Sequence, residues 1–351
     1  MNEGGPTQTG DRPARKALLL RLKAWWEGYD PDEYARWVAA REAALRAANG
    51  KDSPEEVEEP PVVEDEQPEE PEPSATPEIP IDPWDDRRAE IAQYIWGEGY
   101  CGPGGPEHVI SMSKLLALSP KQSLLEIGSN LGGPARTLAQ KFGVWVTGYE
   151  SSPNLVELAN EISHRKGLLK KAEVFHYDPD TITDFDRRYD RALAKESLYQ
   201  VENKAHLLEV VEAHMKPGAL FLITDYVLGD ESWVATDEYR EWRDRESERR
   251  RPRLTTAEDI VSMLKKVRFN IRVNEDVSDH YIELINESWK GADRVAEKVA
   301  TQDDGEALVQ TLLREAEFWS TRVRLLRDGK LRVRRILATK KSEKPAMLSD
   351  W

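Results

Sequence analysis

The sequence predicts an α/β protein whose core is a doubly wound, mostly parallel sheet with helices on both faces. From Trp84 onward, short apolar runs alternate with stretches of helical periodicity, and this alternation is typical of a parallel sheet. A glycine-rich turn, residues 128–133, directly follows the first apolar run. Ligands of such sheets bind at the carboxyl ends of the strands, so this turn is the expected binding region.

The expected elements follow one another in chain order. A helix over about 85–96 leads into a glycine-rich loop, residues 97–105, and a second helix is expected over about 106–117. Strands are then expected over 123–127, 144–149, 172–176, near 189–194 and over 220–224, and helices over 133–142, 153–166 and 203–214. Most consecutive strands are therefore joined by a helix, as the crossovers of a parallel sheet require.

The N-terminal part differs in composition from the rest, which predicts three regions. Residues 1–50 are expected to form a helical arm, with two helical pieces inside residues 13–49. Residues 51–82 hold eight prolines, and Lys51 to Pro80 carries a net charge of −11, so we expect a disordered acidic linker. The folded domain is expected over residues 83–345.

Composition also excludes several classes of function. The formal net charge is −15, but most of it lies in the linker, and no basic field that would attract nucleic acid remains elsewhere. The single cysteine, Cys101, rules out an internal disulfide and a zinc site built on thiolates. The histidines have no metal-ligand spacing, and no apolar run approaches the ~18 residues of a membrane span. We therefore expect a cytoplasmic protein with no metal and no nucleic-acid partner.

Two acidic residues strengthen the case for a ligand at the glycine-rich turn. Glu150 lies at the end of the second expected strand, where a carboxylate can accept both hydroxyls of a ribose. Asp178 follows the third strand, where it could accept a hydrogen bond from an adenine amine. The simpler alternatives are a helix N-terminal charge for Glu150 and a turn former before Pro179 for Asp178. The combined pattern favours a cofactor that contains a nucleoside.

The turn itself favours S-adenosylmethionine over a dinucleotide. Its pattern is Gly-x-Asn-x-Gly-Gly, whereas a pyrophosphate is bound by Gly-x-Gly-x-x-Gly at a helix N-terminus. Glu126, two residues before Gly128, suits a cofactor with cationic ammonium and sulfonium groups better than one with a diphosphate. A dinucleotide-dependent dehydrogenase is the less favoured alternative.

Several segments of the chain resemble the phosphoethanolamine N-methyltransferases, which are class I methyltransferases that convert phosphoethanolamine towards phosphocholine. The segments are Trp96–Gly105, Leu125–Gly128, Met215–Gly218 and Leu222–Tyr226, and the likeness runs from about Trp84 to Lys341. The resemblance implies a Rossmann-like class I methyltransferase fold and S-adenosylmethionine as cofactor.

The resemblance also implies roles for individual residues. Tyr100, Cys101 and Gly102 would form a lid over the cofactor. The methionine end would be surrounded by Glu126, Gly128, Asn130 and Gly132, the ribose by Glu150 and Ser151, and the adenine by Asp178, with Lys195 as a further cofactor-binding residue. Tyr226 and Arg322 fall where the family has a tyrosine and a lysine that hold the substrate phosphate, and arginine is a competent phosphate ligand.

Four positions depart from the family's pattern. Trp84 and Gln200 stand where the family has a tyrosine and a histidine that close over the site, Glu196 replaces an aspartate, and Asn130 replaces a glycine. Glu196, Gln200 and Tyr226 are the candidate catalytic residues, with Trp84 as a further substrate contact. Glu196 could accept a proton or pair with an amine, and its simpler alternative is a solvated charge at a helix start. Gln200 cannot act as a base but could orient an acceptor.

We therefore expect a methyltransferase that uses S-adenosylmethionine to methylate a small polar acceptor, such as a phosphorylated molecule or a lipid headgroup. The first alternative is a non-catalytic methyltransferase-like scaffold that binds through its N-terminal arm. The second is a methyltransferase whose protein or lipid substrate is delivered by the arm. The arm carries tryptophans beside lysine and arginine, which suits a partner protein or weak, peripheral contact with a membrane through residues 13–49.

The segment from Arg240 to Arg253 is dense in charges of both signs. An exposed helix end with pairs of opposite charge four residues apart is the expected structure. The alternative is a cap that binds anions over the substrate pocket.

Overall fold

The computed structural model describes residue 36 and residues 82–247 and 252–342. The chain divides into two units, residues 1–81 and 82–351, and the described residues other than Arg36 all belong to the second unit. Apart from Arg36, the predicted arm and nearly all of the predicted linker lie outside the described residues. Within the described residues, no helix is long and apolar enough to cross a membrane.

The second unit is built on a mixed sheet of seven strands in the order β3-β2-β1-β4-β5-β7-β6. The parallel strands are β1 (Ser123–Ile127), β2 (Trp145–Glu150), β3 (Ala172–His176), β4 (Tyr189–Lys195) and β5 (Met215–Leu228). The strand β7 (Leu331–Lys340) runs antiparallel between β5 and β6 (Phe269–Asp276). The predicted fold class, a doubly wound and mostly parallel sheet, is confirmed.

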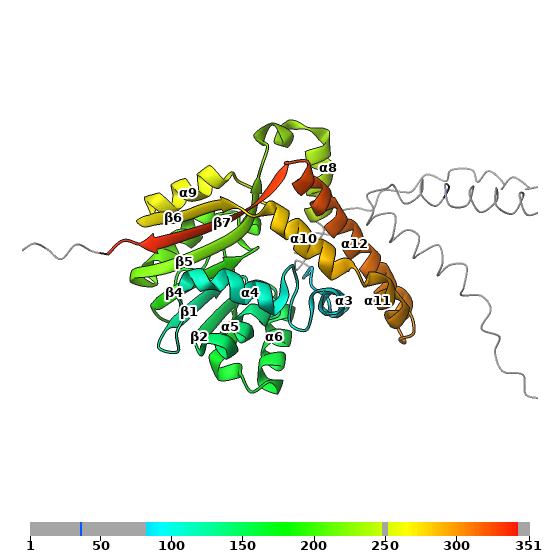
Figure 1. Cartoon of the computed structure of the whole chain (residues 1–351), viewed down its shortest axis with the longest axis horizontal. Coiled ribbons are helices and arrows are strands. Elements are labelled where there is room, and N and C mark those ends of the chain that lie inside the picture. The colour runs from blue at the N-terminus through cyan, green and yellow to red at the C-terminus, as the bar shows by residue number, and fades with distance from the viewer. Residues whose placement is uncertain (1–35, 37–81, 248–251, 343–351) are drawn as a thin grey trace, which may run out of the picture. The chain divides into compact units, whose positions relative to one another are not determined.

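Helices cover both faces and one end of the sheet (Figure 1). Those that join or flank the strands are α4 (Gly105–Ser113), α5 (Gly133–Phe142), α6 (Pro153–Arg165), α7 (Lys204–Ala213) and α9 (Ala257–Lys266). A second group consists of α3 (Asp86–Trp96), α10 (Ser278–Trp289), α11 (Ala292–Val299) and α12 (Gly305–Arg327), which contact one another. The cap helix α8 (Asp237–Ser247) follows the 3-10 turn η4 (Glu231–Ala235).

Two of the predicted elements differ in extent from the structure, and the sequence predicts neither β6 and β7 nor the helices α9 to α12. The helix expected over 106–117 is the shorter α4 followed by the 3-10 turn η1 (Lys114–Leu116), and it ends where Ala117 takes a left-handed conformation with φ 47°. The strand expected over 220–224 is much longer. It begins at Met215, which pairs with Tyr189, and continues through an irregular register at Gly218.

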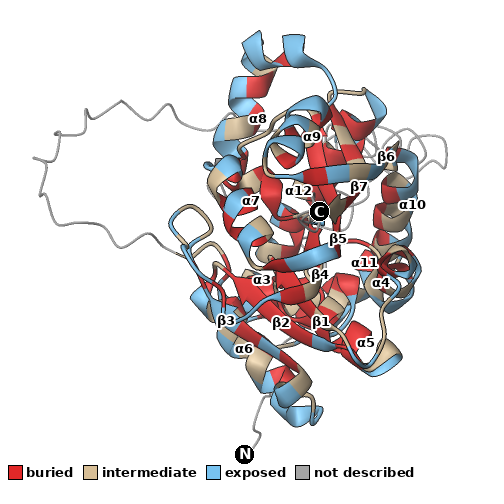
Figure 2. Cartoon of the chain, turned by 90° about the vertical axis from the view of Figure 1, so that its left-hand side faces the viewer, coloured by how far each residue is buried: buried red, intermediate tan, exposed pale blue. Residues whose placement is uncertain are grey.

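The core lies along the central strands, whose residues are mostly buried (Figure 2), and their apolar side chains form one cluster with those of the neighbouring helices. Leu125 and Ile127 on β1 and Phe221 and Ile223 on β5 are completely buried. Near-continuous apolar strands are expected when a sheet is covered on both faces. This core fixes the carboxyl ends of β1, β2 and β4, and the loops at those ends form the candidate site.

Candidate active site

The turn after β1 is held in a conformation that few residues accept. Gly128, Asn130 and Gly132 all have left-handed backbones, with φ of 72°, 48° and 70°. A Cβ atom added to Gly128 would lie 2.3 Å from the Cβ atom of Ser197, so only glycine fits there. Asparagine tolerates the left-handed region better than most residues, and Asn130 also donates from Nδ2 to the carbonyl of Gly128 at 2.9 Å.

Glu150 joins this turn to the start of α6. Its Oε2 accepts a hydrogen bond from the backbone N–H of Asn130 at 2.9 Å. Its Oε1 accepts from the N–H groups of Ser151 and Ser152, at 2.9 and 3.0 Å. The carboxylate is completely buried. Glu150 therefore lies both at the N-terminus of a helix, as the simpler alternative expects, and beside the turn where the cofactor is expected.

Glu126 lies behind the turn, near the end of β1, with only 1% of the residue exposed. Ser129 donates its hydroxyl to the Glu126 carboxylate at 2.9 Å. Burial raises the pKa of Glu126 to about 7, because the hydrogen bond from Ser129 and the charges of Arg136 and Lys195 only partly offset the loss of solvation. The group therefore changes its charge near neutral pH.

A cavity of about 70 Å³ opens beside this turn. By the same measure one water needs ~10–15 Å³, so the cavity has room for a small molecule or part of one. It is lined by the loop before α4, the turn after β1, the end of β4 and side chains of α3, α8 and α12. Ten of the predicted site residues line it: Trp84, Tyr100, Cys101, Gly102, Gly128, Asn130, Lys195, Glu196, Gln200 and Arg322.

The other predicted site residues do not line this cavity. Glu126, Gly132, Glu150 and Ser151 lie behind or beside the turn. Tyr226 is 2% exposed, and its ring lies under the guanidinium of Arg322, with Cζ 4.6 Å from the ring centre. Asp178 is exposed, and its Oδ1 accepts from the N–H of Asp180 at 2.9 Å, which is the geometry of a turn former.

Glu196 has an unusual backbone directly after β4. Its φ is 54°, its N–H donates to the carbonyl of Thr224 at 2.8 Å, and its side chain is 10% exposed and paired with Lys195. A solvated charge at a helix start would be exposed, so that alternative does not describe this side chain. Left-handed backbones of non-glycine residues are costly and are concentrated at functional sites.

Three ion pairs surround the cavity. Lys195 pairs with Glu196, Arg88 with Glu315 at 2.9 Å, and Arg322 with Glu246 at 2.9 Å. All six side chains are at most 11% exposed. The charges of the cavity therefore cancel in pairs rather than forming a basic or an acidic pocket.

Sequence reasoning missed half of these charged residues and part of the aromatic lining. The missed residues are Arg88, Tyr199, Glu246, Glu315, Phe318 and Trp319. One signal was present, because Glu315, Phe318, Trp319 and Arg322 have the spacing of a single helix face. No sequence pattern links that face to Arg88, which is 227 positions from Glu315.

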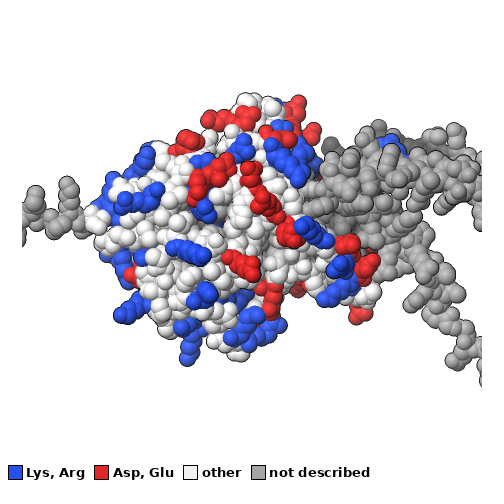
Figure 3. Space-filling view, in the orientation of Figure 1, with Lys and Arg blue, Asp and Glu red and all other residues white. Residues whose placement is uncertain are grey.

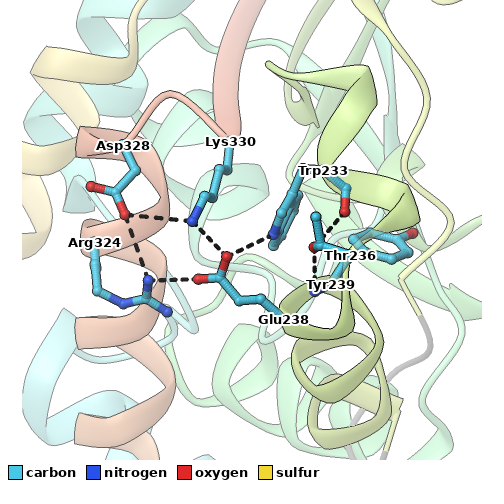
Figure 4. Close-up of polar contacts among 7 residues, drawn as sticks. All are labelled: Trp233, Thr236, Glu238, Tyr239, Arg324, Asp328 and Lys330. Carbon is cyan, nitrogen blue, oxygen red and sulfur yellow. Dashed lines mark hydrogen bonds and ion pairs between the residues drawn. The ribbon is translucent and has the colours of Figure 1, made fainter.

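The cap helix α8 is anchored through Glu238 (Figure 4). The Glu238 carboxylate accepts from Arg324 at 2.8 Å, from Lys330 at 2.5 Å and from the indole of Trp233 at 3.2 Å. Hydrogen bonds from Lys330 and Arg324 lower the pKa of Glu238 to about 2. The cap is therefore tied to the end of α12 and the start of β7.

The described part of the charged segment 240–253 has the paired, exposed charges of a helix end, but none of its described basic side chains lines the cavity, as an anion-binding cap would require. Arg240 pairs with Asp237 on an exposed face of α8, although the spacing is three residues rather than four. Two turns from Glu238, the buried Glu246 reaches the cavity, so an acidic side chain of the cap faces it. Residues 249–251 lie outside the described residues. Basic and acidic side chains are interspersed over the face of the molecule in Figure 3.

Comparison with known proteins gives the fold a family context. Residues 108–272 match the family model described as a methyltransferase domain. A phosphoethanolamine N-methyltransferase of Plasmodium falciparum is 29% identical over 208 residues, which are 58% of this chain and 75% of the relative. One from Zea mays is 28% identical over 191 residues, which are 54% of this chain but only 36% of the relative.

Solved structures agree with the fold. A phosphoethanolamine N-methyltransferase 2 of Haemonchus contortus, in complex with phosphomonomethylethanolamine and S-adenosylhomocysteine, has a TM-score of 0.62 at 22% identity. The match covers 72% of this chain and 57% of that one. A cyclopropane synthase of Mycobacterium tuberculosis also has a TM-score of 0.62, at 13% identity, over 73% of this chain and 94% of the other. At such identities the likeness shows the class I methyltransferase fold alone.

Proposed function

We propose that the chain methylates a small polar acceptor such as a lipid headgroup. The premise is that it is an S-adenosylmethionine-dependent methyltransferase of class I that resembles the phosphoethanolamine N-methyltransferases. One observation carries this proposal. The glycine turn after β1 and the carboxylate of Glu196 line the same small cavity. The donor and the acceptor of a methyl group must meet in line, and a shared cavity permits that. The names of the relatives support a polar headgroup as acceptor.

The residues around the turn fit the cofactor. Gly128 carries no side chain and lines the cavity, so a ligand can approach the backbone of the turn closely there. We assign the methionine end to Gly128, Asn130 and Gly132, with the Glu126 carboxylate behind them. Glu150 and Ser151 would hold the ribose and Asp178 the adenine. Tyr100, Cys101 and Gly102 would close over the cofactor, and the Tyr100 hydroxyl is bonded to Thr137 at 2.6 Å.

The bound cofactor supplies an electrophilic methyl group. The chain's own residues would orient the acceptor and manage its proton. In this assignment Glu196 accepts the proton of an acceptor amine or pairs with its charge, while Lys195 keeps the carboxylate in place. Gln200 orients the acceptor through its amide. Burial raises the pKa of Tyr100 to about 12, so its phenol stays neutral beside the cofactor.

Glu196→Gln tests the assignment of the acceptor side. We expect kcat for methyl transfer to a small amine to fall by about 100-fold or more, because glutamine cannot accept the proton. Affinity for S-adenosylmethionine should stay within about threefold, since Glu196 is placed on the acceptor side. Labelled methyl transfer to ethanolamine, phosphoethanolamine and their N-methylated forms provides the measurement. Glu202→Gln, on the exposed end of the same loop, is the control, and equal activity of both variants would contradict the assignment.

Glu126 predicts how cofactor affinity depends on pH. The pKa of the carboxyl is about 7 in the free protein, so the group is mostly neutral at pH 6 and mostly charged at pH 8. A cationic cofactor group binds the charged form, so affinity should rise by about tenfold from pH 6 to pH 8 and then level off. Calorimetric titrations with S-adenosylmethionine at pH 6, 7 and 8 measure this.

Glu126→Gln should remove that increase and leave only the part due to the cofactor's own titration. Asp225 is the other carboxyl group that could cause a pH dependence of cofactor affinity in this range, because burial raises its pKa to about 7 as well. Its carboxylate, however, accepts from the backbone of Ser197, Leu198 and Tyr226 and does not line the cavity. An unchanged pH profile in Glu126→Gln would contradict the placement of Glu126 beside the cofactor's positive charge.

A further inference from the structure

Arg322 is not available to a phosphate in the structure. Its Nη2 donates to the carboxylate of Glu246 at 2.9 Å and to the hydroxyl of Tyr199 at 3.1 Å. The side chains of Arg322 and Glu246 are 3% and 5% exposed. The positive charge that the family resemblance assigns to a substrate phosphate is therefore matched by a carboxylate of this chain.

The guanidinium is also held in position by aromatic rings. Its Cζ lies 4.3 Å from the ring centre of Phe318, 4.6 Å from that of Tyr226 and 5.0 Å from that of Tyr199. Rings on several sides prevent Arg322 from turning towards a different anion without losing these contacts. An entering phosphate would have to displace Glu246 rather than draw Arg322 away from it.

The carboxylate that pairs with Arg322 is itself supported. Glu246 lies on α8, and two turns earlier in the same helix Glu238 is bonded to Arg324 and Lys330 (Figure 4). Arg324 belongs to α12, the helix that carries Arg322. The anchor at Glu238 therefore holds the cap against α12 and keeps Glu246 beside Arg322.

The rest of the cavity offers no unmatched positive charge among the lining residues that the structure describes. Arg88 is paired with Glu315, and Lys195 with Glu196. A phosphate monoester binds through several charge-assisted hydrogen bonds to unpaired cations. In this cavity each cation is already bonded to a carboxylate, so a phosphate would have to compete with that carboxylate for it. Nε of Arg322 is buried without a hydrogen-bond partner, but the charge of the guanidinium is already matched by Glu246.

We propose that Glu246 is a specificity-determining residue that excludes phosphate monoesters, so that the acceptor is a small polar amine or alcohol without a phosphate group. This inference rests on the proposed methyltransferase function and narrows its substrate class. The carboxylate of Glu246 takes the place beside Arg322 that an acceptor phosphate would take. The acceptor then contributes an amine or hydroxyl to a cavity whose own charges are already balanced.

Binding of phosphoethanolamine and ethanolamine to the full chain, in the presence of S-adenosylhomocysteine, tests this. The wild type should bind phosphoethanolamine at least about tenfold more weakly than ethanolamine. Glu246→Gln should bind phosphoethanolamine at least about tenfold more tightly than the wild type, because its amide oxygen can still accept from Arg322 but no longer cancels the charge. Glu317→Gln is the matched control, since its carboxylate pairs with the exposed Arg245 at 3.8 Å.

Two results would overturn the proposal: equal or tighter binding of phosphoethanolamine by the wild type, or no gain in a folded Glu246→Gln variant. Thermal melting shows whether the variant folds, and the wild-type comparison decides the question if it does not. Inorganic phosphate serves as a second probe, which should bind to Glu246→Gln and not to the wild type. If the wild type does not bind S-adenosylhomocysteine, the proposed function is refuted. Binding of inorganic phosphate to the wild type and to Glu246→Gln can still be compared in that case.

Discussion

Gly128→Ala is expected to abolish detectable cofactor binding, whereas Gly167→Ala should leave it unchanged. Both glycines have left-handed backbones, with φ of 72° and 66°, so both substitutions cost about 1 kcal/mol of backbone strain. Only at Gly128 would the new Cβ atom collide, at 2.3 Å from the Cβ atom of Ser197, while nothing lies within 4 Å at Gly167. The collision should add about 1–3 kcal/mol of destabilisation.

The collision cannot be relieved by moving Ser197. Its N–H donates to Asp225 at 3.0 Å and its hydroxyl donates to the carbonyl of Ile127 at 3.0 Å. The turn itself must therefore shift, and a displacement of about 1 Å in a binding loop can cost about 100-fold in function. Calorimetry with S-adenosylmethionine and thermal melting measure both effects. Similar behaviour of the two variants would mean that the turn is not the cofactor site.

Glu315→Ala should lower the free energy of unfolding by about 3–5 kcal/mol, because it leaves Arg88 buried without its carboxylate. The Arg88 and Glu315 side chains are 11% and 6% exposed and 2.9 Å apart. Trp319 would also lose the acceptor of its indole N–H, which is 3.3 Å from Glu315. Arg88 would keep only its bond to the carbonyl of Pro83 at 2.9 Å.

The adjacent arginine provides a control for the same measurement. Arg87 pairs with Asp304 at 3.0 Å, but these side chains are 50% and 48% exposed. Asp304→Ala should therefore cost no more than about 1 kcal/mol. Denaturant unfolding of the full chain gives both values. Equal losses in the two variants would contradict the view that burial makes the Arg88–Glu315 pair important.

The sequence was sufficient to predict the central part of the fold. The apolar runs of β1 to β5 and the glycine turn are local patterns, and the helices between these strands indicate parallel pairing. Glu150 and Gly128 are predictable because each lies at the carboxyl end of a strand. Their place in the structure follows from the sheet and needs no information on distant contacts.

The acceptor side of the cavity could not be predicted in the same way. The helices α9 to α12 were not assigned, and α12 packs against α3 through a cluster in which the rings of Trp96 and Trp319 are 4.6 Å apart. Glu246 belongs to a segment whose charges predicted an exposed helix end. Its burial depends on Arg322, 76 positions later, and a long-range ion pair leaves no periodic signal in the sequence.

The predicted roles of the N-terminal arm remain predictions. Residues 1–50 other than Arg36 lie outside the described residues, so a scaffold that acts through the arm and a substrate delivered by it are both open to experiment. Turnover that is lost when residues 1–82 are removed would favour delivery, and cofactor binding without turnover on any acceptor would favour the scaffold.

Titration of the full wild-type chain with S-adenosylmethionine tests the central claim most directly, since every assignment above depends on a cofactor at the turn after β1. Isothermal calorimetry should show saturable binding at one site per chain. Absence of binding at millimolar cofactor would contradict the account and would leave a methyltransferase fold without its chemistry.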